Sequence, residues 1–330
     1  MRAFLKFALI ATVAFGLWIG WGLWLPTSPA LPQTILLRPG WSTRHIALEL
    51  HQAGVIHSSD AFLLYHLLSK PSSLKAGEYW FPCCENAIRV HERIARGEVL
   101  QHTVIVPEGF NIFEIAGAVE GANLGTKEEF LSAAHASSGL ITDLDPQAKS
   151  LEGYLFPDTY EFTRTQSMAD IVATMVRRFR QAAREIGLVP NPDLHRIVTL
   201  ASIVEKETAV PDERPMVAGV YSNRIAKGMA LNADPSVIYA SMLAGSYDGV
   251  IHQSELQSNS PYNTYKFAGL PPGPIANPGR DSLKAALHPA INDYYYFVSD
   301  NSGHHRFART LDEHSRNVAL YRKAVAATNR

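Results

Sequence analysis

The sequence predicts an α+β protein with an N-terminal transmembrane helix, a small βααβ module and a mixed α/β domain that carries an acidic helix. Three observations support this prediction. An uncharged apolar run covers Phe7–Leu25, a strand–turn–helix pattern occurs twice before residue 120, and turn and helix signals become dense after residue 190. Apolar residues make up 46% of the 330 residues and the formal net charge is -1. This composition is globular and gives no sign of a nucleic-acid-binding surface.

The apolar run at the N-terminus predicts a membrane anchor over residues 1–25. Phe7–Leu25 is long enough to cross a bilayer, and tryptophans suited to a membrane interface gather toward its far end, namely Trp18, Trp21 and Trp24. Arg2 and Lys6 precede the run, so we expect a cytoplasmic N-terminus and an extracytoplasmic remainder. Ser28–Ala30 matches a signal-peptide cleavage site only weakly, so we expect the anchor to be retained.

A repeat follows the Pro/Ser-rich linker at residues 26–33. "TILLRPGWSTRHIA" (34–47) aligns without a gap with "TVIVPEGFNIFEIA" (103–116), and each copy predicts a strand, a Pro/Gly turn and a helix capped by Ser42 or Asn111. In the first copy, a helix at 59–68 and a strand at 76–82 complete a βααβ module over residues 34–100. Chance similarity over so short a window is the alternative.

Cysteine and histidine patterns indicate neither a disulfide framework nor a metal site. Cys83 and Cys84 are adjacent, and a bridge between neighbours strains the intervening peptide, so we expect two free thiols. The sequence does not indicate their role. His304 and His305 are also adjacent, no HExxH pattern occurs, and we expect no metal and no cofactor.

Two further regions complete the predicted organisation. Residues 101–190 hold the second strand–helix unit and a connecting helical region, interrupted by an aromatic extended stretch at 151–162. Residues 191–330 form the last predicted domain, which opens with a helix capped by Asp193 and reaching Glu207. A second helix starts near Pro211. A Pro/Gly loop at 269–279, a short helix and a strand at 293–300 follow.

Two carboxylates stand at the end of the first helix of this domain. On a helix, Leu200, Ile203 and Glu207 share one face, whereas Glu205 lies on another, so at most one carboxylate can act as the acid. An apolar wall beside Glu207 would raise its pKa, which suits a general acid. The alternative is that both glutamates are ordinary charged residues at a helix end.

The chain resembles the endolytic murein transglycosylases of the YceG/MltG-like family in three ordered segments. These are "LASIVEKETAVPDERPMVAGVYSNRIAKGMALNADPSVIY", "SPYNTYKFAGLPPGPIANPGRDSLKAALHP" and "YYYFVSDNSGHHRF". The module with "LRPGWS" at its first turn resembles the LysM peptidoglycan-binding domain in layout. The Glu-Thr pair at a helix end resembles the Glu-Ser motif of lysozyme-like lytic transglycosylases.

The resemblance implies that residues 191–330 are the catalytic domain and that Glu207 has a catalytic role. That residue would protonate the oxygen between N-acetylmuramic acid and N-acetylglucosamine, after which the muramyl C6 hydroxyl would close a 1,6-anhydro ring. The resemblance also implies substrate-binding positions, at Asn232, Asp234, Tyr262, Asn263 and Tyr265, and supporting positions at Glu205 and His305. The family commonly reads Leu-Gln-Ser/Thr-Asp-Pro where this chain has "LNADP", and His305 fits a Gly-His-x-Phe pattern only with a slip of one residue.

The resemblance further implies a single-pass protein of the bacterial inner membrane that cuts nascent glycan strands and ends their elongation. Its partners would be peptidoglycan strands and peptidoglycan synthases of the penicillin-binding protein class. Two alternatives stay open: a non-catalytic wall-binding adaptor, and a muramidase with two carboxylates, for which Asp234 and Asp158 are candidates for the second group.

Overall fold

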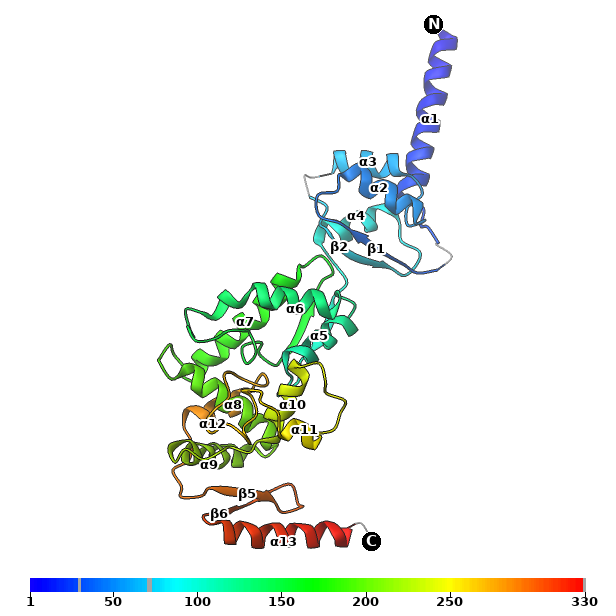
Figure 1. Cartoon of the computed structure of the whole chain (residues 1–330). Coiled ribbons are helices and arrows are strands. Elements are labelled where there is room, and N and C mark those ends of the chain that lie inside the picture. Colours follow the sequence, from blue (N-terminus) through cyan, green and yellow to red (C-terminus); the bar gives the residue numbers. More distant parts are fainter. Residues whose placement is uncertain (29–30, 70–72, 329–330) are drawn as a thin grey trace. The chain divides into compact units, whose positions relative to one another are not determined.

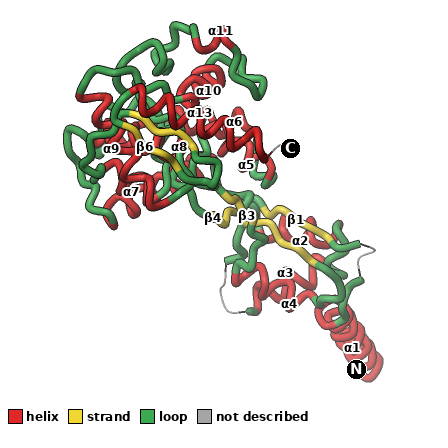
Figure 2. The backbone as a smooth tube through the Cα atoms, turned by 90° about the horizontal axis from the view of Figure 1, so that it is seen from below, coloured by secondary structure: helices red, strands yellow, loops and turns green. Residues whose placement is uncertain are grey.

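The computed structural model describes residues 1–28, 31–69 and 73–328, and the chain folds into two compact units (Figure 1). Unit 1 comprises Met1–Thr103 with Glu161–Ser167, and unit 2 comprises Val104–Tyr160 with Met168–Arg330. Helices and loops predominate, and strands occur as short pairs (Figure 2). The α+β class is therefore confirmed. The predicted boundary between residues 190 and 191 falls inside unit 2. Residues 29 and 30 of the predicted linker, and with them Ala30 of the weak cleavage match, lie outside the described residues.

Unit 1 has the predicted strand–helix–helix–strand order after a long apolar helix. Its elements are α1 (Arg2–Trp24), β1 (Gln33–Leu37), α2 (Thr43–Gln52), α3 (Ser59–Leu68), β2 (Gly77–Phe81) and α4 (Ala87–Arg96). β1 and β2 pair antiparallel, with Ile35 opposite Tyr79. α1 is long and apolar enough to cross a bilayer.

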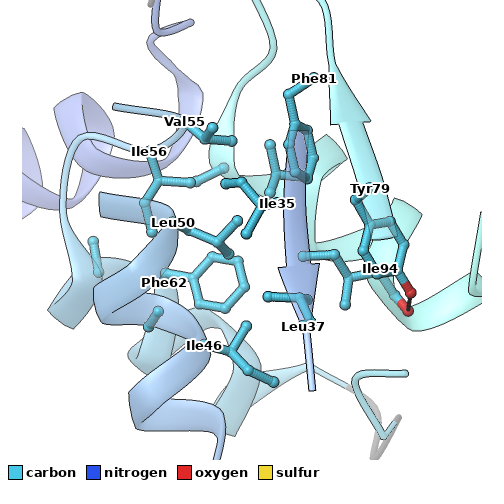
Figure 3. Close-up of a cluster of buried hydrophobic side chains, with 14 of the residues drawn as sticks. Ile35, Leu37, Ile46, Leu50, Val55, Ile56, Phe62, Tyr79, Phe81 and Ile94 are labelled. Atoms are coloured by element: carbon cyan, nitrogen blue, oxygen red, sulfur yellow. Dashed lines mark hydrogen bonds between the residues drawn. The ribbon is translucent and has the colours of Figure 1, made fainter. Parts of the chain in front are cut away.

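The core of unit 1 lies between the two-stranded ribbon and its helices. One face of β1 contributes Ile35 and Leu37, and side chains of α2 and α3 such as Leu50 and Phe62 meet them (Figure 3). Alternate residues of a strand point to the same face, so only every second residue of β1 is buried. The first helix starts as predicted, because the Ser42 side chain accepts a hydrogen bond from the backbone N–H of His45.

Two features of unit 1 differ from the sequence predictions. The expectation of free thiols is wrong, because Cys83 and Cys84 form a disulfide with each other. Cys84 has a φ of +58°, a left-handed conformation that bends the chain locally and that residue types alone do not reveal. The helix α4 was not predicted either. It begins at an Asn86 cap and ends at Gly97, whose φ of +76° closes the helix.

Unit 2 is built mainly from helices. Its helical elements are α5 (Ile112–Gly121), α6 (Lys127–Ala136), the 3-10 turn η1 (Ser138–Ile141), α7 (Met168–Glu185), α8 (Leu194–Glu207), the 3-10 turn η2 (Pro211–Glu213), α9 (Arg214–Ala226), α10 (Asp234–Leu243), α11 (Gln253–Leu256), α12 (Arg280–Leu287) and α13 (Leu311–Thr328). The strands are β3 (His102–Ile105), which pairs with β4 (Thr159–Phe162), and the antiparallel hairpin of β5 (Tyr296–Ser299) and β6 (His305–Ala308). The unit boundary passes through β3 and β4.

The helix α8 lies at the centre of unit 2. It packs against α9, α10 and α12, and it is buried all round over Ile197–Val204. A helix that is apolar on every side needs such a central place. Asp193 precedes it as predicted, but its carboxylate makes no capping hydrogen bond, so that part of the prediction is wrong. The Asn191 side chain instead accepts a hydrogen bond from the Asp193 N–H and shapes the turn into the helix.

Candidate active site

Glu207 is the last residue of α8 and faces a cavity of about 390 Å³. The cavity is lined by residues of α8, α9, the loop before α10, the loop before α12, β5 and α13: Glu207, Tyr221, Arg224, Leu231, Asn232, Tyr265, Tyr296, Phe297, Leu311 and His314. We call it the Glu207 cavity. The buried body of α8 fixes the helix, so the carboxyl group at its end has a defined position.

The surroundings of Glu207 favour its protonated form. Burial is the main cause, and the neighbouring Asp234 carboxylate adds to it. The Tyr221 hydroxyl, which donates a hydrogen bond to Glu207, and the Arg224 guanidinium act in the opposite direction. The net result raises the pKa of Glu207 from 4.5 to about 7. Near neutral pH this carboxyl group can therefore both give and accept a proton.

Asp234 and Tyr265 form a hydrogen-bonded pair beside Glu207. The Tyr265 hydroxyl donates to Asp234 Oδ1 at 2.5 Å, and burial followed by this carboxylate raises the pKa of Tyr265. Asp234 is the first residue of α10, where the helix N-terminus favours a negative charge. Tyr265 remains 41% exposed and presents part of its ring to the Glu207 cavity. The sequence therefore identified three side chains that the fold brings together.

Asn232 joins this group through an unusual backbone conformation. Its φ is +51°, and its N–H donates to the carbonyl oxygen of Thr264 at 3.1 Å. Next to it, the N–H of Ala233 donates to the buried Thr264 hydroxyl at 3.0 Å. These bonds tie the segment before α10 to the segment that carries Tyr265. Asn232 lines the Glu207 cavity.

Asn263 and Tyr262 lie elsewhere in the same loop. Asn263 is fully buried, and its side-chain N–H groups donate to three carbonyl oxygens of the loop, those of Glu255, Leu256 and Ser258. Its Oδ1 accepts from the N–H of Tyr265 at 3.1 Å, so Asn263 shapes the loop that positions Tyr265. Tyr262 is half-buried and its ring packs at 5.2 Å from that of Tyr239. Neither side chain lines the Glu207 cavity.

Glu205 points away from Glu207, as the helical spacing predicted. Its Oε1 lies 3.2 Å from a guanidinium nitrogen of Arg214, and its Oε2 accepts from the N–H of Gly279 at 2.9 Å. Arg214 also lies close to Glu108 and Asp281. Glu205 therefore joins the end of α8 to the starts of α9 and α12.

The Pro/Gly loop at residues 269–279 is interior rather than groove-lining over most of its length. The Ser202 hydroxyl of α8 accepts from the N–H of Ile275 at 3.0 Å. Asn277 is fully buried. Its side-chain oxygen accepts a hydrogen bond from the backbone N–H of Leu155 at 2.8 Å, and its side-chain NH2 donates to the Glu152 carboxylate at 2.8 Å. The loop is thus a structural connection that holds α8 in place.

His305 lies in the β5–β6 hairpin. Its ring nitrogen Nδ1 is 2.6 Å from Glu213 Oε2, and its backbone N–H donates to the same carboxylate at 3.0 Å. His304 Nδ1 also lies 3.2 Å from Glu213. The His305 ring meets Phe297, which lines the Glu207 cavity, edge-on at 5.4 Å. His305 itself is not among the lining residues, so the structure places it behind the cavity wall.

Several cavity residues were missed from the sequence. Arg224 donates to the carbonyl oxygens of Tyr295 at 2.6 Å and Leu231 at 2.7 Å, and its guanidinium lies 5.2 Å from the centre of the Tyr296 ring. It thereby joins α9, the loop before α10 and β5 around the cavity. Tyr221 lies one turn before it on the same face of α9, and this polar pair at the end of an apolar stripe was the available signal. No such signal marked His314.

The other buried or paired carboxylates lie outside the Glu207 cavity. Glu152 accepts from the N–H of Ile112 at 2.9 Å, and burial raises its pKa to about 8. Asp158 pairs with Arg178 at 2.6 Å and lines a separate, arginine-rich cavity of about 670 Å³ over β4 and α7. Of the two candidates for a second carboxylate, Asp234 alone is a neighbour of Glu207. Within the described part of the chain, no three His, Cys, Asp or Glu side chains are placed to hold a metal ion.

Comparisons with known proteins agree on one family. A model of the YceG-like family matches residues 35–320. A Bacillus subtilis protein named endolytic murein transglycosylase is 31% identical over 86% of this chain and 82% of its own length. Two Streptococcus pneumoniae proteins of the same name are 28% identical over 87% of this chain, which spans 58% of their length. A crystal structure of a yceG-like protein from Listeria monocytogenes is 31% identical, with a TM-score of 0.56 over 86% of this chain and 98% of that one.

Proposed function

This chain belongs to the YceG-like family, and we propose that it is a membrane-anchored lytic transglycosylase that cuts murein glycan strands internally. The observation that carries the proposal is Glu207, a carboxyl group with a pKa of about 7 at the edge of a cavity of about 390 Å³. Such a group can protonate a leaving oxygen and then take up a proton again at the same pH. The names of the relatives supply the substrate class, murein.

The reaction we propose needs one carboxyl group. Protonated Glu207 gives its proton to the glycosidic oxygen between N-acetylmuramic acid and N-acetylglucosamine, and the bond from that oxygen to the muramyl anomeric carbon breaks. The muramyl C6 hydroxyl forms a bond to the same carbon, and its proton passes to the Glu207 carboxylate. The products are a free N-acetylglucosamine hydroxyl and a 1,6-anhydromuramyl end, so no water is consumed and the acid is regenerated.

Asp234 has a supporting role in this scheme. Its charge raises the pKa of Glu207, and the Tyr265 hydroxyl holds its carboxylate in place. The exposed part of the Tyr265 ring, with Asn232 beside it, offers a surface on which a sugar ring can stack. The position of Asp234 beside Glu207 also favours the second candidate, a muramidase that uses water and two carboxylates.

The N-terminal part of the chain supports membrane anchoring. α1 is apolar over its middle and end, and Arg2 and Lys6 stand at its start. By the positive-inside rule, these charges favour a cytoplasmic N-terminus. Units 1 and 2 then face the cell wall from the outer side of the inner membrane. We propose a LysM-like role in glycan binding for the βααβ module. Peptidoglycan synthases are the partners that this position suggests.

End-group analysis of the products tests the proposal. Full-length protein in detergent is incubated with uncrosslinked glycan strands, and the fragments are analysed by mass spectrometry for wild type, Glu207→Gln and Glu185→Gln. Glu185 is an exposed residue of α7 and serves as the matched control. We expect anhydro ends from wild type and Glu185→Gln, and no cleavage by Glu207→Gln.

Two other results would replace the proposal. Reducing ends from wild type would identify a hydrolase, for which Asp234 is the candidate second carboxylate. Full complementation of a null strain by Glu207→Gln would identify a non-catalytic wall-binding adaptor.

A further inference from the structure

The end of α1 is packed into unit 1. Residues 2–17 are exposed along the whole helix surface, but Trp18 and Ile19 pack against the hydrophobic core of the unit and Leu23 belongs to it. Gly22 lies so close to α3 that a Cβ at this position would stand 2.7 Å from the Cβ of Ala61. The close approach of the two helices depends on this glycine. The last two turns of the apolar helix are therefore part of the folded unit.

The chain after α1 is also fixed to unit 1. The N–H of Thr27 donates to the carbonyl oxygen of Glu85 at 3.1 Å, and its hydroxyl donates to the carbonyl oxygen of Val55 at 2.7 Å. Thr27 is buried, and the Trp21 ring stacks on the ring of His57 at 4.9 Å. Packing contacts before the helix end and hydrogen bonds after it thus hold α1 on unit 1.

The free part of α1 is too short to cross a bilayer by itself. The apolar residues of this free part, Phe7–Leu17, rise about 1.5 Å each and span about 17 Å, whereas the hydrocarbon core is about 30 Å thick. The missing length of about 13 Å must come from the turns around Trp18–Trp24, which pack on unit 1 with one side while Trp21 and Trp24 stay exposed. A membrane-spanning α1 therefore draws the rim of unit 1 into the interfacial layer of the bilayer.

The helix α3, whose start contacts the end of α1, exposes apolar side chains on its last turn. α3 lies at the end of the unit from which α1 projects (Figure 1), and Leu67 and Leu68 on its last turn are 79% and 76% exposed. Leu64 lies on the same face, one turn earlier, by helical spacing. Asp60 in the first turn is the acidic residue of this helix. Exposed neighbouring leucines suit an apolar partner better than water.

We propose that unit 1 is seated in the headgroup layer of the membrane through Leu64, Leu67 and Leu68 of α3, together with the end of α1. The partner is the lipid surface itself, and apolar side chains rather than charges make the contact. This inference rests on the proposed membrane anchoring. It adds that the module does not hang from a flexible tether but lies against the bilayer in one orientation.

Depth-dependent fluorescence quenching tests this seat. Full-length variants with one added cysteine each, Ala11→Cys, Leu67→Cys and Thr34→Cys, are labelled with an environment-sensitive dye while the native cysteines stay in their disulfide. They are then reconstituted into phosphatidylethanolamine/phosphatidylglycerol vesicles. Ala11 lies in the free part of α1, and Thr34 is an exposed residue of β1 that serves as the control. Nitroxide lipids quench from a deep or a shallow position, and iodide quenches from water.

The expected pattern separates the three positions. The label at Ala11 should be quenched by the deep nitroxide, and the label at Leu67 by the shallow nitroxide, with blue-shifted emission and protection from iodide. The label at Thr34 should respond to iodide alone. If Leu67 behaves like Thr34 while Ala11 is quenched from within the bilayer, the seat is refuted and the anchor stands. If Ala11 is not quenched and alkaline carbonate extracts the protein, anchoring and seat both fail.

Discussion

Replacing Glu207 by Gln should change how the stability of unit 2 depends on pH. The pKa of Glu207 is raised above its ordinary value of 4.5, so the folded protein holds this proton more tightly than the unfolded chain does. The stabilising contribution of the protonated group is complete below pH 4.5 and is lost as the pH rises through about 7. A glutamine stays neutral throughout and still offers Tyr221 an oxygen acceptor, so the variant should lack this loss.

The size of the effect follows from the pKa difference. A rise from 4.5 to about 7 corresponds to about 3.4 kcal/mol, at about 1.36 kcal/mol for each pKa unit. Glu207 is partly open to the cavity, and solvent screening reduces this to about 2–3 kcal/mol. Wild type should therefore lose about 2–3 kcal/mol of unfolding free energy relative to Glu207→Gln between pH 4.5 and pH 7.5.

Urea unfolding of the full-length protein in detergent measures this difference. All five tryptophans lie in unit 1, so their fluorescence follows that unit, while far-ultraviolet circular dichroism follows the many helices of unit 2. Glu205→Gln is the matched control on the same helix. It removes a partner of Arg214 and should destabilise by about 1–3 kcal/mol. Parallel pH curves for wild type and Glu207→Gln would refute the reasoning, because they would mean that Glu207 is ionised in the folded protein.

Three further predictions concern the same site. Cleavage of glycan should slow as the pH rises above about 7, because deprotonated Glu207 cannot act as an acid, and a rate that stays constant up to pH 9 would exclude this role. Tyr265→Phe removes the hydrogen bond that partly offsets the charge of the Asp234 carboxylate, so the alkaline limb of the rate profile should move to higher pH. An unmoved limb would show that this hydrogen bond does not influence the pKa of Glu207. Ser202→Ala leaves the buried N–H of Ile275 without its acceptor and should destabilise unit 2 by about 1–3 kcal/mol in urea unfolding, whereas an unchanged midpoint would mean that water replaces the hydroxyl.

Local periodicity accounts for what the sequence predicted well. The place of Glu207 at the end of an apolar helix, and its divergence from Glu205, follow from spacing within α8. The strand–turn–helix repeats follow from alternating apolar residues, turn glycines and the Ser42 and Asn111 caps. These features involve residues within one or two turns of each other, and so they could be predicted from sequence.

Contacts between distant segments account for what was missed. The Glu207 cavity needs α13, which brings His314 from about 100 residues further along the chain, and no local pattern predicts that contact. Asn263 looked like a polar group available to a sugar, but its loop turns the amide inward to satisfy its own carbonyl groups. The bridge at Cys83 required the left-handed φ of the next residue, which only the folded turn fixes.

The disulfide between Cys83 and Cys84 has a consequence for the topology of the protein. Glutathione and thioredoxin keep cytosolic thiols reduced, whereas an oxidising compartment preserves such a bond. Its redox state in intact cells therefore reports on which side of the membrane the βααβ module has been delivered. A thiol-reactive probe that labels these cysteines only after reduction would establish export of the module without reference to hydropathy or to flanking charges.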